Sequence, residues 1–460
     1  MSHSSTARPA GDVVSEDLLE LARKVAAQAG DGEQVEAFVA RGRSTAVRVH
    51  GGAVESLTQA TSAGIGIRVV SDRRQGFAWA GSLDEAVLAE TLDNARDNAR
   101  YAEPDEWVAM AEPDGVAPPT LDLWRPGGED MAADAKVDRA LALEAAVLAG
   151  DPRIVGVRTA SWRDGAGESA VVTSTGIESG GRATSCWVSV SALASDGDET
   201  TTGGGLSIGR APDEIDLDEA ANDAVERATA LLGAMQPAGG LVTLVLEPRM
   251  AATVLGIVGG MLGGEMVLKG RSPFAERAGE AIAAPVVTLV DDATDPESLA
   301  ADTHDGEGLA TRRIPLIAGG VLQGFLHNTY TGRRAGVPST ASAVRGYRST
   351  PGVGAQALAV TPGQGTLDEL IAGVDHGVLV RTMSGLHSGV NATSGDFSVG
   401  IEGRMIRQGA LAEPVREATI ASTIQRLLLD VRAVGADREW TPGGTAASPL
   451  VVDNVTLSGA

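Results

Sequence analysis

The chain has 460 residues, of which 43% are apolar, and it carries a formal net charge of −24. This size and apolar content are typical of a globular protein of two or three domains and exclude a disordered chain. The negative charge argues against non-specific nucleic-acid binding, which needs a basic surface, and the lone Cys186 excludes an internal disulfide and suits a reducing cytoplasm.

The first 235 residues alternate between helical and extended patterns. Residues 1–14 are polar, unlike a signal peptide, and are predicted to form a disordered tail. Apolar positions at helical spacing predict helices, and alternating positions predict strands. The predicted helices are 15–29, 82–102, 134–149 and 217–232, and the predicted strands are 34–48, 53–58, 63–70, 74–80, 154–162, 168–173, 177–178 and 184–193. Residues 15–235 are therefore predicted to form an N-terminal α+β domain, with helices on a mixed or antiparallel sheet.

The segment Gln236–Gly240 contains proline and glycines and is predicted to link two domains. Residues 241–460 are rich in glycine and in short apolar runs typical of strands, apart from a helix predicted at 421–431. The runs lie at 286–290, 314–317, 357–360, 377–381 and 450–457. This region is predicted to be a β-rich domain that closes into a barrel-like or sandwich form, so the predicted fold class is α+β. No apolar run approaches the roughly 20 residues of a membrane span, so no membrane contact is expected.

Motifs for hydrolytic chemistry are absent from the sequence. It contains no His-Glu-x-x-His, Cys-x-x-Cys, Gly-x-Ser-x-Gly or phosphate-binding loop. No two of the six histidines are three or four residues apart, so no helix presents a chelating pair. Asp437, Glu439 and Glu265 are acidic, but an oxygen-only cation site needs several converging carboxylates. The sequence therefore predicts no catalytic residue and no metal ligand.

The charge pattern of residues 308–367 is unusual. These 60 residues contain no acid, whereas the overall frequency of 61 in 460 would place about eight there, and they contain six arginines. A cationic segment on an anionic protein is suited to binding a carboxylate, a peptide C-terminus or an acidic partner. The alternative is a buried β-rich segment from which acids are excluded. The candidate binding residues are Arg333, Arg334 and Arg345, of which the first two lie in the polar, glycine-rich stretch 327–352.

A glycine-rich stretch at 383–400 reads MSGLHSGVNATSGDFSVG. Glycines and small hydroxyl residues let backbone approach backbone, as needed when an extended peptide pairs with a strand edge. The alternative is a structural hairpin in which side chains stabilise the turn. Asn391, Ser394 and Asp396 are the candidate binding residues of this stretch.

Residues 241–275 and 383–437 resemble the TldD/PmbA family of gyrase-modulator-type metallopeptidases. Active members of that family carry a zinc-binding His-Glu-x-x-x-His on the helix that follows the strand at 241–246. The six motif positions fall here on Leu255, Gly256, Ile257, Val258, Gly259 and Gly260. The family's third ligand, a cysteine near the C-terminus, would fall within Asp437–Gly444, which has none. The chain thus resembles the PmbA/TldE branch, which lacks the zinc motif.

The resemblance implies a dimer around an enclosed cavity, formed by a metal-free and a metal-bearing subunit. It implies that this chain holds no cofactor and that zinc lies in a TldD-like partner. This chain would then be a cytoplasmic, non-catalytic subunit that closes the chamber and binds unfolded peptide. Two alternatives remain: a stand-alone hydrolase of peptides or amide-type metabolites, and a homodimeric binding or regulatory protein. The residues expected to contact peptide or partner are Arg333, Arg334, Arg345, Asn391, Ser394 and Asp396.

Overall fold

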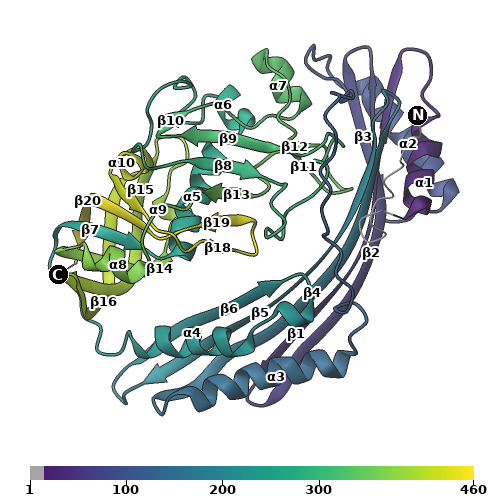
Figure 1. Ribbon diagram of the computed structural model, residues 1–460. Coiled ribbons are helices and arrows are strands. Elements are labelled where there is room, and N and C mark those ends of the chain that lie inside the picture. Colours follow the sequence, from purple (N-terminus) through teal and green to yellow (C-terminus); the bar gives the residue numbers. More distant parts are fainter. Residues whose placement is uncertain (1–14, 460) are drawn as a thin grey trace, which may run out of the picture.

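The computed structural model describes residues 15–459, so the predicted disordered tail, residues 1–14, lies outside the described residues. In Figure 1 a long, curved sheet carries the N-terminal helices, and the C-terminal region lies within its concave side. Helices combined with extensive sheets confirm the predicted α+β class. The last N-terminal helix ends at Thr229, and the first strand of the C-terminal region begins at Gly240.

The N-terminal sheet has the strand order β3-β2-β1-β4-β5-β6, and every neighbouring pair is antiparallel. The strands are β1 (Glu33–His50), β2 (Ala53–Ser71), β3 (Arg74–Ala80), β4 (Ile154–Thr173), β5 (Glu178–Ser195) and β6 (Thr200–Gly209). β1 and β2 form one long hairpin, in which Glu33 pairs with Ser71 and His50 with Ala53. Of the two predicted arrangements, mixed and antiparallel, this sheet is antiparallel.

Three strands of this sheet are longer than the sequence predicts. Strand β2 is continuous where the sequence predicts two strands, 53–58 and 63–70, and β4 and β5 each join two predicted strands in the same way. Residues 53–62 of β2 are exposed throughout, so no alternation of burial marks them. Pairing with β1 keeps them extended. Period-two patterning therefore identifies only the half-buried parts of a strand.

Strand β6 was not predicted, because the sequence TTTGGGLSIG offers almost no apolar residues. Its glycines are required by the helix that packs on it. A Cβ atom at Gly203 would lie 2.2 Å from the backbone nitrogen of Ala228, and one at Gly205 would lie 1.7 Å from the carbonyl oxygen of Ala220. Helix α4 (Leu217–Thr229) therefore contacts the backbone of β6 directly, and glycine marks a close approach within a strand.

The four long helices of the N-terminal region match the predicted ones within a few residues. They are α1 (Glu16–Ala26), α2 (Glu85–Tyr101), α3 (Ala133–Gly150) and α4 (Leu217–Thr229), and a short 3-10 helix spans Pro212–Glu214. Helices α1 and α2 cover one end of the curved sheet, and α3 and α4 cover the other (Figure 1). Each pair builds its own core, one around Leu92 and Ile67 and the other around Trp162 and Leu143.

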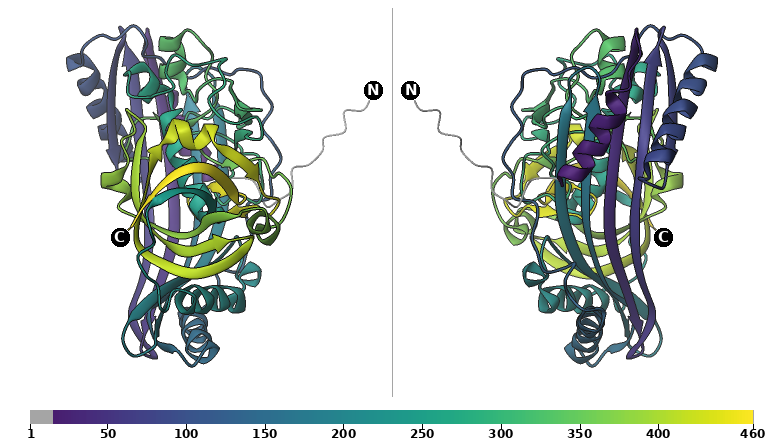
Figure 2. Two further views of the ribbon diagram at one scale, coloured as in Figure 1. Left: turned by 90° about the vertical axis from the view of Figure 1, so that its left-hand side faces the viewer. Right: turned by 90° about the vertical axis from the view of Figure 1, so that its right-hand side faces the viewer.

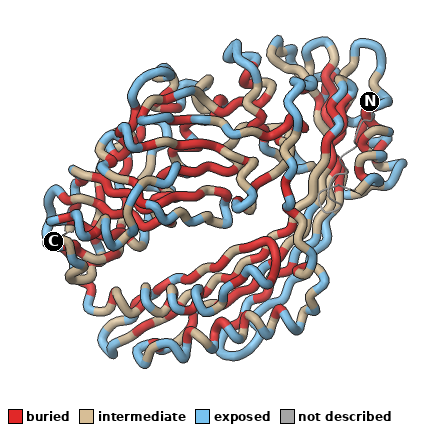
Figure 3. The backbone as a smooth tube through the Cα atoms, viewed as in Figure 1, coloured by how far each residue is buried: buried red, intermediate tan, exposed pale blue. Residues whose placement is uncertain are grey.

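The C-terminal region contains a closed barrel of five strands. They are β7 (Gly240–Leu246), β14 (His376–Ser384), β15 (Asp396–Arg407), β16 (Ala410–Thr423) and β20 (Leu450–Ser458). β7 pairs with β14, β14 with β15 and β15 with β16, and β16 then pairs with β20, which returns to β7 (Figure 2). The barrel-like form is therefore the one observed. Figure 3 shows buried residues along these strands and also along the strands of the N-terminal sheet.

A second C-terminal sheet has the order β10-β9-β8-β13-β19-β18. Its strands are β8 (Leu289–Asp292), β9 (Arg313–Ala318), β10 (Val321–Leu322), β13 (Leu358–Val360), β18 (Glu439–Trp440) and β19 (Thr445–Ala447). Helix α5 (Pro248–Met261) contacts β13 and β19 of this sheet and β7 and β14 of the barrel. The remaining elements are α6 (Gly264–Leu268), α7 (Thr329–Ala335), β11 (Ala343–Val344), β12 (Gly352–Val353), α8 (Leu367–Ala372), α9 (Leu386–Gly389), α10 (Ile424–Leu429) and β17 (Val431–Val434).

The helix predicted at 421–431 is shorter in the structure. Strand β16 continues to Thr423, which pairs with Asp396 of β15. The Thr423 hydroxyl then accepts a hydrogen bond from the backbone nitrogen of Arg426 and caps α10. A capping threonine at the end of a strand fixes the switch between the two structures.

Candidate functional site

Helix α5 carries all six positions at which the resemblance places the zinc motif. Leu255 and Val258 are buried in the core of the C-terminal region, whereas Gly256 and Gly260 lie on the exposed side of the helix. Zinc is held by imidazole, thiolate or carboxylate groups, and none of the six side chains offers one. The residues at these positions do not fit a zinc ion.

Two adjacent glycines of α5 differ in what surrounds them. A Cβ atom at Gly259 would lie 2.7 Å from Cδ2 of Leu358, so a larger residue there would displace the Leu358 side chain of β13. A Cβ atom at Gly260 would meet no atom within 4 Å. The exposed side of α5 near Gly260 therefore has room for a side chain that this sequence does not supply.

The C-terminal stretch that would hold the family's cysteine places an acid near α5. Glu439 of β18 is exposed, and one of its carboxylate oxygens lies 3.5 Å from Nε of Arg249, near the start of α5. Within residues 15–459, no group of three or more His, Cys, Asp or Glu side chains is arranged to hold a metal ion. His327 is buried, its Nδ1 lies 3.2 Å from the hydroxyl of Thr331, and burial lowers its pKa.

Ion pairs fix the beginning of α5 against the N-terminal region. Glu247, the residue before the helix, is buried and lies 2.5 Å from Arg227 of α4 and 3.1 Å from Arg381 of β14. Two residues after Glu247, at the start of α5, Arg249 pairs with Asp223 of α4 at 2.9 Å. The charged groups near α5 therefore hold two regions of the fold together.

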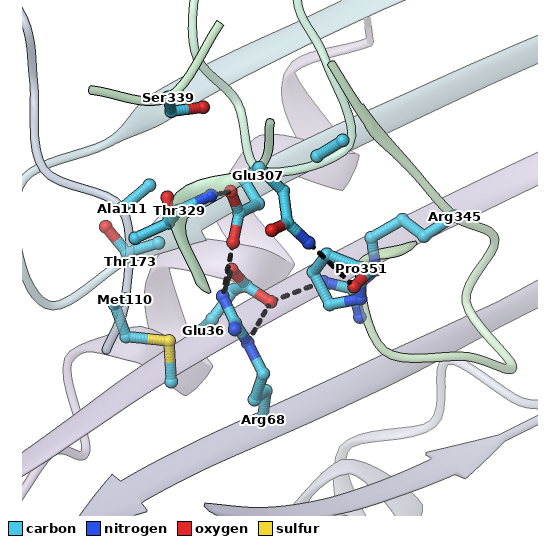
Figure 4. A network of polar contacts seen from close by, with 12 residues as sticks. Glu36, Arg68, Met110, Ala111, Thr173, Glu307, Thr329, Ser339, Arg345 and Pro351 are labelled. Carbon is cyan, nitrogen blue, oxygen red and sulfur yellow. Dashed lines mark hydrogen bonds and ion pairs between the residues drawn. The ribbon is translucent and has the colours of Figure 1, made fainter. Parts of the chain in front are cut away.

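A second, fully buried group of charges joins the N-terminal sheet to the C-terminal loops (Figure 4). Arg68 of β2 donates two hydrogen bonds to the carboxylate of Glu36 of β1, from Nε at 3.0 Å and from Nη2 at 2.6 Å. Nη1 of Arg345 also donates to Glu36, and Glu307 accepts from Arg68 at 3.4 Å and from the backbone nitrogen of Thr329 at 2.8 Å. Burial opposes ionisation of Glu36, but the two guanidinium groups outweigh it and hold its pKa below the usual value.

The six arginines of residues 308–367 do not form one surface. The side chain of Arg345 is buried in the charge cluster, whereas Arg333 and Arg334 lie exposed at the end of α7. Nε of Arg333 donates to the carbonyl oxygen of Trp107 at 3.1 Å. Other arginines of the segment pair with acids from outside it, as Arg312 does with Asp114 at 2.5 Å. The segment is therefore not one continuous docking surface: it contains the buried strand β13 and the buried part of β9 as well as the exposed arginines of α7.

Residues 391–396 form a tight, exposed turn at the start of β15. Oδ1 of Asn391 accepts from the backbone nitrogens of Thr393 at 2.9 Å and Ser394 at 3.2 Å, and the Ser394 hydroxyl donates to Asp396 at 2.6 Å. These contacts are those of a structural turn stabilised by its own side chains. Contact of these three residues with peptide stays a prediction.

Sequence reasoning missed two neighbouring cavities between β5 and the loop at 300–310. Their volumes are about 410 and 360 Å³, and both are lined by Ser179, Gly180 and His304. The smaller one is also lined by Arg345 and Gln356. A glycine pair at 180–181 within a strand was the only sequence signal for close packing at this place.

A third cavity, of about 450 Å³, lies between α7 and the N-terminal sheet. It is lined by Arg68, Tyr330 and Arg334, among others, and the hydroxyl of Tyr330 donates to Asp105 at 2.9 Å. Burial raises the pKa of the Tyr330 hydroxyl above its ordinary value, and the neighbouring Asp105 raises it as well. Arg68 of the charge cluster therefore lines the same cavity as Arg334, whereas Arg345 of that cluster lines the smaller cavity beside β5.

A curved antiparallel sheet joined to a closed barrel, with an apolar helix between the barrel and a second sheet, defines a two-part α+β protein. Three family descriptions match it: PmbA/TldA metallopeptidase domain 1 at residues 35–99, the central domain at 126–232 and the C-terminal domain at 239–459. The chain therefore belongs to the PmbA/TldD metallopeptidase family.

Named relatives fall in both branches of the family. The chain is 26% identical to metalloprotease PmbA of Escherichia coli O157:H7, over 93% of this chain and 92% of that protein. It is 25% identical to a metalloprotease TldD homolog of Haemophilus influenzae, over 86% of each chain. The crystal structure of TldE from Thermococcus kodakarensis shares the fold, with a TM-score of 0.84 and 24% identity over 96% of this chain and 99% of that one.

The helices give no sign of a membrane segment. Across residues 15–459, none combines the length and the apolar character needed to cross a bilayer.

Proposed function

We propose that this chain is the metal-free, non-catalytic subunit of a TldD/TldE-type metallopeptidase complex in the cytoplasm. It binds unfolded peptide and closes the chamber, while a TldD-like companion supplies zinc, the general base and hydrolysis. Helix α5 carries this proposal. A catalytic zinc site needs three protein ligands and an open position, and the six motif positions of α5 supply only apolar side chains and hydrogen atoms.

The similarity to both branches supports a two-component assembly. The identity to a protein named PmbA is 26% and to one named TldD homolog 25%, each over most of the chain. A companion of the second kind would share this fold. Two subunits of the same fold pair with approximate two-fold symmetry through equivalent surfaces. The chain would then contribute one wall of a shared chamber.

Reconstitution with a metal-bearing homologue tests this proposal. The purified chain is mixed with the TldD-type protein of the same organism, and hydrolysis of an unfolded peptide is followed alone and in mixture, together with size-exclusion chromatography. We expect a mixed complex and faster hydrolysis than the TldD-type protein achieves alone. Serum albumin at the same mass concentration controls for non-specific protection. A homodimer that ignores the TldD-type protein, with unchanged hydrolysis, would contradict the proposal.

A further inference from the structure

A hairpin of the C-terminal region reaches across to the N-terminal sheet. Its strands β11 and β12 pair antiparallel, Ala343 with Val353, and the residues between them form its tip. The tip lies directly on strand β2, because a Cβ atom at Gly64 would collide with the ring of Tyr347, and one at Gly66 would collide with the carbonyl oxygen of Tyr347. The hairpin therefore joins the two regions of the fold.

The same hairpin forms part of the walls of two cavities. Ala343, Val344 and Arg345, at its beginning, line the cavity of about 360 Å³ beside β5. Residues 350–352, at its end, line the cavity of about 450 Å³ beside α7. A movement of the hairpin would therefore change the shape of both cavities.

Asp305, in the loop between β8 and β9, holds the first residue of the hairpin. Its Oδ2 accepts a hydrogen bond from the backbone nitrogen of Ala343 at 3.0 Å. Its Oδ1 accepts from the backbone nitrogens of Glu307 at 2.9 Å and Leu309 at 3.0 Å. The backbone nitrogen of Gly306 also donates to the carbonyl oxygen of Ala343 at 2.8 Å. One buried carboxyl group thus ties the loop to the hairpin.

The charges beside Asp305 balance without it. The buried charge cluster contains two carboxylates and two guanidinium groups, those of Glu36, Glu307, Arg68 and Arg345 (Figure 4). An ionised Asp305 adds a negative charge that no group of this cluster matches, whereas a protonated Asp305 leaves the cluster neutral. Burying an unmatched charge costs free energy, so the buried surroundings favour the protonated form.

The other groups near Asp305 bear on its titration. Two of them, Asp302 and His304 of the same loop, line the same cavity. The three backbone N–H groups favour ionised Asp305, but burial and the neighbouring Glu307 outweigh them and raise its pKa to about 7. Burial also raises the pKa of Asp302, to about 6. Asp305 therefore changes its charge near neutral pH, whereas an exposed aspartate does so near about 4.

We propose that Asp305 is a proton-dependent clasp for the hairpin 343–353. With its proton, the carboxyl group leaves the charge cluster neutral, and the hairpin stays on the N-terminal sheet. Without the proton, the extra charge beside Glu307 favours release of the hairpin, because a displaced hairpin admits water to the carboxylate. This regulation goes beyond the proposed function and requires neither a partner subunit nor a peptide.

The direction of the pH effect follows from proton linkage. The open form loses the proton of Asp305 near about pH 4, and the closed form keeps it until about pH 7. Opening of the hairpin therefore becomes easier as pH rises from about 4 to about 7 and is level above.

Hydrogen exchange of the isolated full-length chain, followed by mass spectrometry at about pH 6 and about pH 8, tests the clasp. The protection factor of residues 343–353 is compared, since it corrects the measured rate for the intrinsic pH dependence of exchange. We expect it to fall about tenfold from the lower to the higher pH. Strand β15 provides the internal reference and should show no such fall. A constant or rising protection factor of the hairpin, or an equal fall in β15, would overturn the proposal.

Two substitutions test whether the change comes from Asp305. Asp305→Asn removes the group that titrates and leaves Asp302 and His304 in place, so the pH dependence of hairpin protection should disappear. Glu307→Gln removes the carboxylate that helps to raise the pKa of Asp305, so the fall in protection should move to lower pH. Unchanged pH dependence in Asp305→Asn, or an unmoved midpoint in Glu307→Gln, contradicts the clasp.

The matched control is Asp196→Asn. Oδ1 of Asp196 also accepts from two backbone nitrogens, those of Asp198 and Glu199, each at 3.2 Å. Asp196 is exposed, however, and lies in the turn between β5 and β6. Hairpin protection in this variant should keep the pH dependence of the natural chain, and its loss would show that the effect is not specific to Asp305.

Discussion

Helix α5 and the cavity beside Arg345 differ in the chemistry that they offer. The exposed side of α5 presents Gly256 and Gly260, and therefore backbone and empty space. Around the cavity, the guanidinium edge of Arg345, the hydroxyl of Ser179 and the amide oxygen of Gln356 are buried and have no hydrogen-bond partner within residues 15–459. The first region lies where the family resemblance places hydrolytic chemistry, and the second lies away from it.

The difference separates two properties of one fold, because the buried polar groups and the helix where the family resemblance places zinc lie in different regions. Polar groups that are costly to bury have been kept at the cavity, whereas the helix has no group that could bind a metal or move a proton. This is the pattern expected of a subunit that binds and a companion that reacts.

The largest effect is expected from the buried charge cluster, of which Arg345 also lines the cavity. Glu36→Gln removes the anion between Arg68 and Arg345 and leaves both guanidinium groups buried without it. Breaking a buried ion pair typically costs about 3–5 kcal/mol of unfolding free energy. Urea unfolding of the variant should show this loss.

An exposed ion pair provides the control for that measurement. Arg407 and Glu413 pair on the surface of β15 and β16, so Arg407→Gln should leave the urea midpoint nearly unchanged. Equal losses in the two variants would mean that burial does not distinguish the cluster, and the account of the cavity wall would be wrong.

A buried acid behind Gln356 gives a pH-dependent prediction. Oδ1 of Asp291 accepts from the backbone nitrogens of Gln356 and Ala357, and burial raises its pKa to about 6. The folded state thus keeps the proton after the unfolded state has lost it, so stability falls as pH rises from about 4 to about 6 and is level above. Asp291→Asn keeps an oxygen that can accept these two hydrogen bonds and removes the group that titrates.

As pH rises, the unfolding free energy of Asp291→Asn should therefore increase relative to that of the natural chain, by about 3 kcal/mol over the whole titration. Urea unfolding of both chains at about pH 5 and about pH 8 checks this. A difference between Asp291→Asn and the natural chain that is independent of pH would show that Asp291 is ionised throughout.

The smallest effects concern α5 itself. Gly259→Ala places a Cβ atom against Leu358 and should cost about 1–3 kcal/mol by overpacking. Gly260→Ala meets no atom and should stabilise the helix by about 0.5–1 kcal/mol. Thermal unfolding compares the two. A loss at Gly260 as large as that at Gly259 would show that the exposed side of α5 is packed, against the description given above.

Much of the fold could be predicted from the sequence, because burial leaves periodic patterns. The helices over the N-terminal sheet and the final strand at 450–458 follow such patterns closely. Residues 53–62 and strand β6 do not, since one is exposed throughout and the other is glycine-rich under α4. Their extended form depends on neighbours far away in the chain.

The candidate site was less predictable for the same reason. The absence of acids in residues 308–367 suggested an open cationic surface, but Arg345 pairs with Glu36, more than 300 residues earlier. No local pattern reveals such a pair, and none reveals that Ser179 and Gln356 share a cavity wall. The absence of zinc ligands at the six motif positions of α5, by contrast, follows from the sequence, because it depends only on which residues stand there.

The most direct test of the account is the metal content and turnover of the isolated chain. Purified without chelators, it should contain no stoichiometric zinc by mass spectrometry of the elements and should not hydrolyse an unfolded peptide, with or without added zinc. A tightly held transition-metal ion, together with hydrolysis that stops when the ion is removed and returns when it is restored, would contradict the account.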